Sequence, residues 1–430
     1  MLDKYFKLTA LGTNVRQEVV AGVTTFLTMA YIIFVNPAIL SEAGMDYGAV
    51  FVATCLAAAI GCFIMGFYAN YPIALAPGMG LNAFFTYTVV LTEGYSWQSA
   101  LGAVFFSGLI FVFLSLFKVR EWIINSIPGP LKIGIAAGIG MFLALVGLKN
   151  GGVIVENPAT MVGLGDVTGL PFLLAVLGFF LIIGMAARGM RAAVMVGILI
   201  ITALGIAFGD VQYSGLVSTP PSIMPTLMQL DIAGAFNISM LSVIFAFLFV
   251  DLFDTSGTLI AVAQRGKMLD EQGRLPRLGR ALLADSTASI AGSMLGTSTT
   301  TSYVESTAGV AVGGRSGLTA VVTGLLFIAA LLFSPLAGMV PPYATAGALV
   351  YVAVLMMGQL YHLQWDDITE AVPAVVVLVM MPFTFSIANG IAFGFISFVA
   401  VKVLAGRYSE VSPVVWILSL LFVGKFAFGV

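Results

Sequence analysis

Apolar segments long enough to cross a membrane follow one another along almost the whole chain of 430 residues. Hydrophobic residues make up 60% of the sequence and charged residues only 9%, whereas a soluble domain carries about 25% charged residues. A transmembrane helix needs about 20 consecutive apolar residues. The sequence therefore predicts an all-α polytopic membrane protein, in which every polar group inside an apolar segment needs an explanation.

We expect about 14 transmembrane segments from the lengths of the apolar stretches. The expected segments lie at 17–40, 48–68, 73–91, 98–117, 132–148, 171–187, 191–208, 239–263, 281–295, 302–313, 317–334, 343–360, 368–385 and 387–404. One further apolar segment follows at 412–428. Thr25, Thr28 and the pair Asn36 and Pro37 make the first segment unusually polar and predict a break near its outer end.

Two of these segments, 73–91 and 302–313, differ from ordinary transmembrane helices. The first begins YPIALAPGMG, with prolines and glycines before its apolar part, and the second is preceded by GTSTTTSY, which is rich in hydroxyl side chains. Non-helical backbone at membrane depth is tolerated only where it is buried in protein or lines a cavity. We therefore expect two broken elements, each an extended strand that leads into a half-helix.

The positive charges predict the orientation of the chain in the membrane. With the N-terminus in the cytoplasm, 16 of the 18 Lys and Arg residues fall on the cytoplasmic side. The two exceptions are Lys149, which falls outside, and Lys425, which lies in the last apolar segment. Cytoplasmic loops carry an excess of these residues. The alternation holds only if both broken elements count as spans. The sequence predicts a multi-pass protein of the cytoplasmic (inner) membrane.

The two halves of the chain resemble each other. SALGAVFFSGLIF from Ser99 resembles SGLTAVVTGLLF from Ser316, and AAGIGMFLALVGL from Ala136 resembles TAGALVYVAVLMMG from Thr345. In both halves the broken element precedes these matches. Seven spans per half is an odd number, so the second half would be inserted upside down. Inverted repeats with paired broken segments are typical of transporters that alternate access to a site at the midplane.

Four carboxylates lie inside apolar segments between residues 245 and 317: Asp251, Asp254, Asp285 and Glu305. A charged side chain at mid-membrane costs roughly 3 kcal/mol or more unless it faces a cavity or a partner. These residues are therefore the first candidates for a functional site. Asp366, Asp367 and Glu370 fall near a membrane edge and are expected to be solvated, and His362 is expected to lie in an exposed loop.

Long motifs resemble the adenine–guanine–hypoxanthine permeases, the AzgA-like branch of the nucleobase–cation symporters. They are GVTTFLTMAYIIFVNPAIL, YPIALAPGMGLNAFFTYTVV, DLFDTSGTL, LLADSTASIAG, TSTTTSYVESTAGVAVGGRSGLTAVVTGLLF and TEAVPAVVVLVMMPFTFSIANGIAFGF. The resemblance implies a 7+7 inverted repeat, proton-coupled uptake of purine bases, and gate-domain contacts between two copies in a homodimer. It implies core domains at 1–130 and 211–340, gate domains at 131–210 and 341–411, and an additional segment at 412–430.

The resemblance places Glu305 and Asp254 at the substrate. A carboxylate accepts the N–H groups of a purine in charge-assisted hydrogen bonds, about twice as strong as neutral ones. We expect Glu305, at the start of the second half-helix, to bind the base directly and Asp254 to couple proton entry to uptake. Alternatively, Asp254 only pins the core helices. Asp251 and Asp285 are either proton-relay acids or structural acids.

The remaining expected site residues surround these acids. Asn82 offers both a donor and an acceptor to a purine edge, and Gly80 allows close approach of the backbone. Phe84 and Tyr303 are candidates for stacking on the flat base, and packing is the alternative for both. Thr255 and Gly257 flank Asp254.

Composition argues against several other classes of protein. One histidine and two cysteines leave too few ligands for a metal cluster, and no cofactor or nucleic-acid partner is expected. An anion carrier of the same general fold would need basic groups at its site. A membrane-embedded hydrolase would need histidine chemistry, and the acids favour gated exchange over a passive channel. Which purine is preferred stays open.

Overall fold

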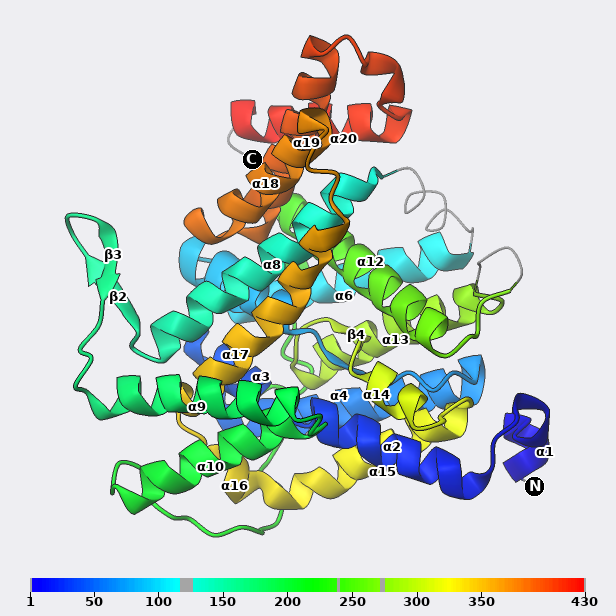
Figure 1. The fold of residues 1–430 in the computed structure, drawn as a ribbon, viewed down its shortest axis with the longest axis vertical. Helices are drawn as coiled ribbons and strands as arrows, with labels where there is room; N and C mark the ends of the chain where they lie inside the picture. The colour runs from blue at the N-terminus through cyan, green and yellow to red at the C-terminus, as the bar shows by residue number, and fades with distance from the viewer. Residues whose placement is uncertain (1, 117–126, 238–239, 271–274, 429–430) are drawn as a thin grey trace.

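The computed structural model describes residues 2–116, 127–237, 240–270 and 275–428. It is built almost entirely of helices (Figure 1), with two short two-stranded sheets. In this part of the chain, nine helices are long and apolar enough to cross a membrane, and four shorter apolar helices accompany them. The predicted fold class, an all-α polytopic membrane protein, is confirmed. Lys118, Arg120 and Arg274, which entered the orientation argument, lie outside the described residues.

The elements of the first half follow the expected segments closely. In chain order they are α1 (Leu2–Phe6), η1 (Thr9–Leu11), α2 (Val15–Met29), α3 (Ile32–Glu42), α4 (Tyr47–Ile64), η2 (Met65–Ala69), β1 (Leu75–Pro77), α5 (Met79–Ala83), η3 (Phe84–Thr92), α6 (Trp97–Leu116), α8 (Gly129–Asn150), β2 (Ile154–Asn157), β3 (Met161–Leu164), α9 (Leu170–Ala187), α10 (Ala193–Ala207) and α11 (Ile232–Ala235).

The second half also contains both long and short helices. Its elements are α12 (Met240–Arg265), α13 (Leu278–Leu295), β4 (Thr300–Ser302), α14 (Ser306–Ala311), α15 (Gly317–Ala330), η4 (Leu331–Phe333), α16 (Ser334–Gly338), α17 (Pro342–Met357), η5 (Gly358–His362), α18 (Ile368–Phe383), α19 (Ile387–Leu404), η6 (Tyr408–Glu410) and α20 (Pro413–Phe428). His362 is exposed, as expected.

Both expected broken elements have the predicted form of a strand that leads into a short helix. β1 precedes α5, and β4 precedes α14. The two strands pair antiparallel, with Ala76 opposite Thr301 at the centre of the register. This pairing satisfies backbone groups that would otherwise be unpaired at membrane depth.

The first segment breaks at a different place from the one predicted. α2 ends at Met29 and α3 begins at Ile32, whereas Pro37 lies inside α3. A proline ring clashes with the carbonyl group four residues earlier, which is that of Ile33. The disturbance therefore falls ahead of the proline, and Tyr31 lies at the break rather than Asn36.

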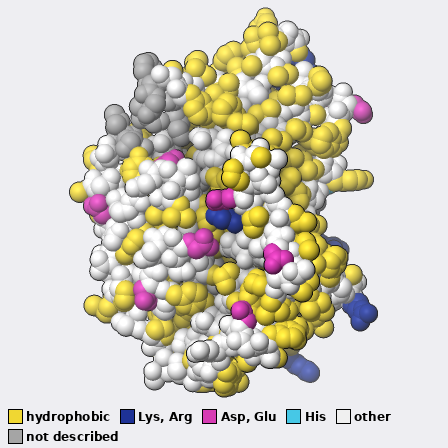
Figure 2. Space-filling model, turned by 90° about the vertical axis from the view of Figure 1, so that its left-hand side faces the viewer, with side chains coloured by type: hydrophobic (Ala, Val, Ile, Leu, Met, Phe, Trp, Pro, Cys, Tyr) yellow, Lys and Arg dark blue, Asp and Glu magenta, His cyan; other side chains and the backbone are white. Residues whose placement is uncertain are grey.

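The helices form two groups that pack mainly within themselves. In one group α8 packs against α17, α18 and α19, and α9 packs against α10 and α17. In the other group α13 packs against α4 and α6, and α15 packs against α2 and α4. Hydrophobic side chains cover much of the face in Figure 2 and leave charged groups scattered across it. Large exposed hydrophobic residues such as Phe180, Phe383 and Leu404 suit contact with lipid.

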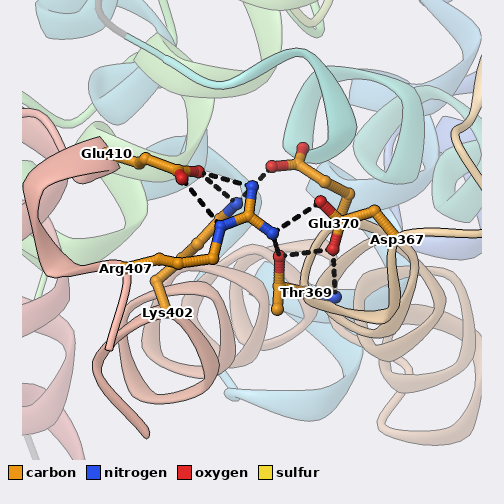
Figure 3. Close-up of polar contacts among 6 residues, drawn as sticks. All are labelled: Asp367, Thr369, Glu370, Lys402, Arg407 and Glu410. Atoms are coloured by element: carbon orange, nitrogen blue, oxygen red, sulfur yellow. Dashed lines mark hydrogen bonds and ion pairs between the residues drawn. The ribbon is translucent and has the colours of Figure 1, made fainter. Parts of the chain in front are cut away.

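A cluster of ion pairs joins the ends of α18 and α19 to the turn before α20 (Figure 3). Lys402, which is fully buried, bonds Glu370 at 2.5 Å and Glu410 at 2.8 Å. Arg407 pairs with Asp367 at 2.7 Å and with Glu410 at 2.7 Å. The expectation that Asp367 and Glu370 are merely solvated is wrong, because basic side chains from the end of α19 and the turn after it reach both of them.

Candidate substrate-binding site

The crossing of β1 and β4 brings the two halves of the chain together. Leu75 pairs with Ser302, Ala76 with Thr301 and Pro77 with Thr300. Hydrogen bonds extend the crossing at both ends, from Gly78 N to Thr299 O at 3.0 Å and from Tyr303 N to Ala74 O at 2.9 Å. Because the strands are antiparallel, α5 and α14 begin at opposite ends of this short crossing.

Glu305 immediately precedes α14 and is half-buried. The hydroxyl of Tyr31 donates a hydrogen bond of 2.5 Å to Glu305 Oε1. The Thr28 hydroxyl lies 3.4 Å from the Glu305 carbonyl oxygen. The break between α2 and α3 thus places the Tyr31 phenol against the Glu305 carboxylate. Thr28, near the end of α2, contacts the backbone of the same glutamate.

Asp254 reaches the crossing from α12 and is also half-buried. The Thr301 hydroxyl donates to Asp254 Oδ2 at 3.2 Å. A Cβ atom built on Gly78 would lie 3.7 Å from the same oxygen, so the carboxylate sits beside the turn between β1 and α5. Both strands of the crossing therefore contribute to the surroundings of Asp254.

Tyr303 lies near both acids. It interacts electrostatically with both Glu305 and Asp254, and the two carboxylates interact with each other. Its hydroxyl donates to Pro77 O at 2.5 Å, and the side chain is buried. The structure therefore brings together Asp254, Tyr303 and Glu305.

A second polar cluster lies beside the first and is closed to solvent. Thr255, Asp251 and Asp285 are each 0% exposed. Thr255 Oγ1 lies 3.1 Å from Asp251 Oδ1 and 2.8 Å from Asp285 Oδ1. The Ser302 hydroxyl approaches the same oxygen of Asp285 at 3.5 Å. Burial separates these acids from the half-buried pair Asp254 and Glu305.

The expected residues of the first broken element have different surroundings. Asn82 is buried and accepts a hydrogen bond from the Ser298 hydroxyl, and its Nδ2 has no hydrogen-bond partner among the described residues. A Cβ atom on Gly80 would lie 2.6 Å from Ile139 Cγ2, so this glycine lets α5 pack against α8.

The structure records no contact between Phe84 or Gly257 and the two half-buried acids. Phe84 is buried and packs edge to face on Phe247, with ring centroids 4.9 Å apart. Gly257 is exposed, and no atom lies within 4 Å of a Cβ built on it. Nothing in these surroundings indicates a ligand.

Sequence reasoning missed Tyr31, Thr301, Ser298 and Gly78. Thr301 and Ser298 belong to a hydroxyl-rich stretch that the sequence identified only as a whole. Tyr31 lies in the apolar run MAYIIFV, where no spacing distinguishes it from a packing residue. Within the residues the structure describes, no group of three or more His, Cys, Asp or Glu side chains could hold a metal ion.

Comparison with known proteins agrees with this architecture. Residues 16–393 match the model of the family described as "Permease family". Adenine permease AdeP of Escherichia coli (strain K12) is 54% identical over 428 residues, which cover 100% of this chain and 96% of AdeP. Guanine/hypoxanthine permease PbuG of Bacillus subtilis (strain 168) is 48% identical over 439 residues and covers 99% of this chain and 100% of PbuG.

Solved structures share the fold at low sequence identity. The transmembrane domain of the cyanobacterial bicarbonate transporter BicA aligns with a TM-score of 0.66 and 17% identity, covering 87% of this chain and 97% of that domain. The murine anion transporter Slc26a9 in its inward-facing state aligns with a TM-score of 0.66 and 12% identity, covering 91% of this chain and 68% of Slc26a9. These likenesses show the fold alone.

The match to the family model covers most of the chain, and the relatives align over nearly their whole lengths. These relatives are named permeases, so they are transporters rather than enzymes. The chain therefore belongs to the permease family, in the branch of the adenine and guanine/hypoxanthine permeases.

Proposed function

We propose that this protein imports a purine nucleobase (adenine, hypoxanthine or guanine) together with protons, by alternating access. The observation that carries the proposal is the pair of half-buried carboxylates, Asp254 and Glu305, beside the crossing of β1 and β4. A purine base is uncharged and flat, and its edge carries N–H donors beside ring-nitrogen acceptors. Carboxylates accept such N–H groups, and the half-buried position leaves part of each acid exposed.

Each contact in the site has a role in this proposal. Tyr31 occupies one oxygen of Glu305, so the base would bond the other oxygen or share the first. Thr301 orients Asp254 in the same way. Tyr303 is a candidate for stacking on the base from between the acids, and Asn82 offers an amide whose Nδ2 has no recorded partner among the described residues. Gly80, Phe84, Thr255 and Gly257, which were also expected at the site, are not assigned a contact with the base, because they serve packing, lie in the closed cluster or lie apart from both acids.

The two helix groups suggest how access alternates. We assign 1–130 and 211–340 to a core that carries the site, and 131–210 and 341–411 to a gate, with 412–430 as an additional segment. In an inverted repeat, rocking of the core against the gate would expose the site first to one side of the membrane and then to the other. We further propose a cytoplasmic N-terminus in the inner membrane and a homodimer.

Anion carriage is the second candidate, because the similar solved structures include bicarbonate and anion transporters. The site opposes it, since Asp254 and Glu305 would repel an anion unless both were protonated. A shared fold does not by itself determine the substrate, whereas the side chains at the site do. The two acids of this site therefore carry more weight than the fold. We therefore favour the purine base.

Proton coupling is tested by uptake of labelled adenine and hypoxanthine into cells that lack their own purine permeases. We expect competition by unlabelled purines but not by sulfate or bicarbonate, and loss of accumulation when an uncoupler is added. Uptake that is insensitive to the uncoupler would refute proton symport, but it would still agree with a purine permease. If accumulation by the Asp254→Asn variant still follows the pH gradient, Asp254 does not couple proton entry to uptake.

A further inference from the structure

The N-terminal segment that precedes α2 is packed firmly against the rest of the protein. Phe6 and Leu8 are buried, and they pack against Leu318 at the start of α15. Asn70 joins the same elements, because its Nδ2 donates to Phe6 O at 3.1 Å and its Oδ1 accepts from Gly317 N at 2.7 Å. α1 is therefore held in a defined place on the surface, and the side chains that it exposes there have a fixed position.

Three aromatic side chains lie exposed where α1 meets η2. Tyr5, Phe67 and Tyr68 expose 57%, 48% and 49% of their surfaces. The Tyr5 hydroxyl donates to Phe67 O at 3.0 Å, and the centroids of the two rings lie 6.1 Å apart. Tyrosine is enriched at the boundary between water and lipid, where its ring is in apolar surroundings and its hydroxyl reaches polar ones. The exposed rings therefore suit the headgroup layer of a membrane.

Basic side chains flank these rings. Lys4 lies on α1, Lys7 directly follows it, and Arg280 lies in the first turn of α13; all three are exposed. The guanidinium carbon of Arg280 lies 5.7 Å from the centroid of the Tyr68 ring, within the range of a cation–π interaction. α1, η2 and this turn of α13 carry one acid, Asp3, whose carboxylate accepts hydrogen bonds within the N-terminal segment. The charge of this surface is therefore positive.

The surface lies where membrane-spanning helices end. η2 continues α4 at its end and packs against α13 and α15. Figure 1 shows α1 at the end of α2, on the opposite side of the molecule from the hairpin of β2 and β3. The ends of spans lie at the level of the lipid headgroups. We call the exposed side chains at this level the N-terminal patch, which consists of Lys4, Tyr5, Lys7, Phe67, Tyr68 and Arg280.

We propose that the N-terminal patch binds the headgroup of an anionic phospholipid. Lysine and arginine donate charge-assisted hydrogen bonds to phosphate oxygens, and basic segments beside a membrane span attract anionic lipids. A zwitterionic headgroup carries a cation beside its phosphate, which the three basic side chains would repel, so the patch should prefer a lipid with net negative charge. A free phosphate ion would leave the exposed rings without a partner. A lipid is therefore the occupant that suits both the charges and the rings.

Photolabelling of the full-length protein in phosphatidylcholine vesicles tests this proposal. A trace of photoreactive phosphatidylglycerol or photoreactive phosphatidylcholine is added, with the reactive group near the headgroup in both, and mass spectrometry of peptides locates the label. We expect labelling of residues 2–8 and 65–70 to be about tenfold greater with phosphatidylglycerol. Equal labelling of these residues by the two lipids would overturn the proposal. Displacement of the label by soluble glycerol phosphate would indicate a site for a free anion and would also overturn it.

Charge variants separate the patch from the general attraction of basic loops to anionic lipid. The triple variant Lys4→Gln/Lys7→Gln/Arg280→Gln should label equally with both lipids at residues 2–8 and 65–70. The double variant Arg188→Gln/Arg191→Gln changes two exposed arginines between α9 and α10 and should keep the wild-type preference. Size exclusion should show both variants folded, because every changed side chain is exposed. A preference for phosphatidylglycerol that persists in the triple variant would overturn the proposal.

Discussion

Single hydroxyl groups set the electrostatics of the proposed site. Tyr31 donates at 2.5 Å to one oxygen of Glu305 and lies fully buried at the break between α2 and α3. A hydrogen bond to a charged group contributes about 1.5 to 3 kcal/mol. The phenol therefore limits which oxygen of Glu305 a base can reach, and it holds that carboxylate in one orientation.

Tyr31→Phe should raise KM for purine uptake about tenfold, because the base then meets a carboxylate that has lost one donor. Uptake kinetics in cells measure this change. Tyr343→Phe is the matched control. The Tyr343 hydroxyl donates a hydrogen bond of 2.7 Å to Asp210, outside the proposed site, so its loss should leave KM unchanged. Equal KM values in Tyr31→Phe and wild type would contradict the role of Tyr31.

Phe84 distinguishes packing from substrate contact. Its ring packs on Phe247 with no exposed surface, so Phe84→Leu should lower thermal stability while KM stays close to wild type. The expected cost is about 1 to 3 kcal/mol, because the smaller side chain leaves a cavity in a packed core. Thermal unfolding in detergent and uptake kinetics measure the two effects. A large rise in KM at unchanged stability would instead indicate stacking on the base.

At the scale of elements, Glu18 joins the two halves of the chain. Its buried carboxylate accepts hydrogen bonds from the backbone N–H groups of Arg315, Ser316 and Thr319 and from the hydroxyl groups of Ser316 and Thr319. These N–H groups lie at the start of α15, where they have no partner within the helix. A side chain of α2 thus caps a helix almost 300 residues away in sequence.

Glu18→Gln should reduce the yield of folded protein sharply, because an amide nitrogen replaces one oxygen that accepts several hydrogen bonds. Each buried donor left unpaired costs about 1 to 3 kcal/mol. Fluorescence-detected size exclusion measures the folded fraction. Glu156→Gln, on the exposed hairpin of β2 and β3, should behave as wild type. A normal yield of Glu18→Gln would show that the cap contributes little.

The ion-pair cluster connects α18, α19 and the turn before α20, and it predicts a dependence on pH. Hydrogen bonds from Thr369 and Arg407 lower the pKa of Asp367 to about 2 from 3.8. Those from Arg407 and Lys402 lower the pKa of Glu410 to about 2 from 4.5. A carboxylate whose pKa is depressed on folding stabilises the protein above its unfolded pKa, and this contribution is lost as the pH falls through the folded value.

Arg407→Met should therefore lower the melting temperature at neutral pH. The difference from wild type should shrink as the pH falls from about 4.5 towards about 2. Melting curves of both proteins over this range measure it. Arg188→Met, which changes an exposed arginine, should show no such trend. A difference that stays constant down to the lowest pH would contradict ion pairing as its cause.

The sequence predicts most of these elements because apolar length and the residues that interrupt it are local properties. The predicted span at 132–148 corresponds to α8, and the hydroxyl-rich stretch contains β4. Contacts between distant segments are not local, so the pairing of β1 with β4 and the bond from Tyr31 to Glu305 could not be read from spacing. The same holds for the ion pairs of Glu370 and Asp367, whose basic partners lie more than 30 residues away.

At the scale of the whole molecule, the proposed site lies at the crossing of two strands from opposite halves of the chain. The crossing positions Asp254 and Glu305 from different helices around Tyr303. The closed cluster on α12 and α13 lies directly behind it, through Ser302 and Thr255. Movement of one helix group against the other would carry the strands and these acids together.

The central claim is that the carboxylates of Asp254 and Glu305 bind an uncharged purine base. Equilibrium binding of labelled adenine and hypoxanthine to purified protein tests it without transport. We predict that Glu305→Gln and Asp254→Asn each weaken binding about tenfold or more, while Asp210→Asn, outside the proposed site, binds as wild type does. Binding in Glu305→Gln and Asp254→Asn equal to that of Asp210→Asn, in protein that remains folded, would contradict the claim.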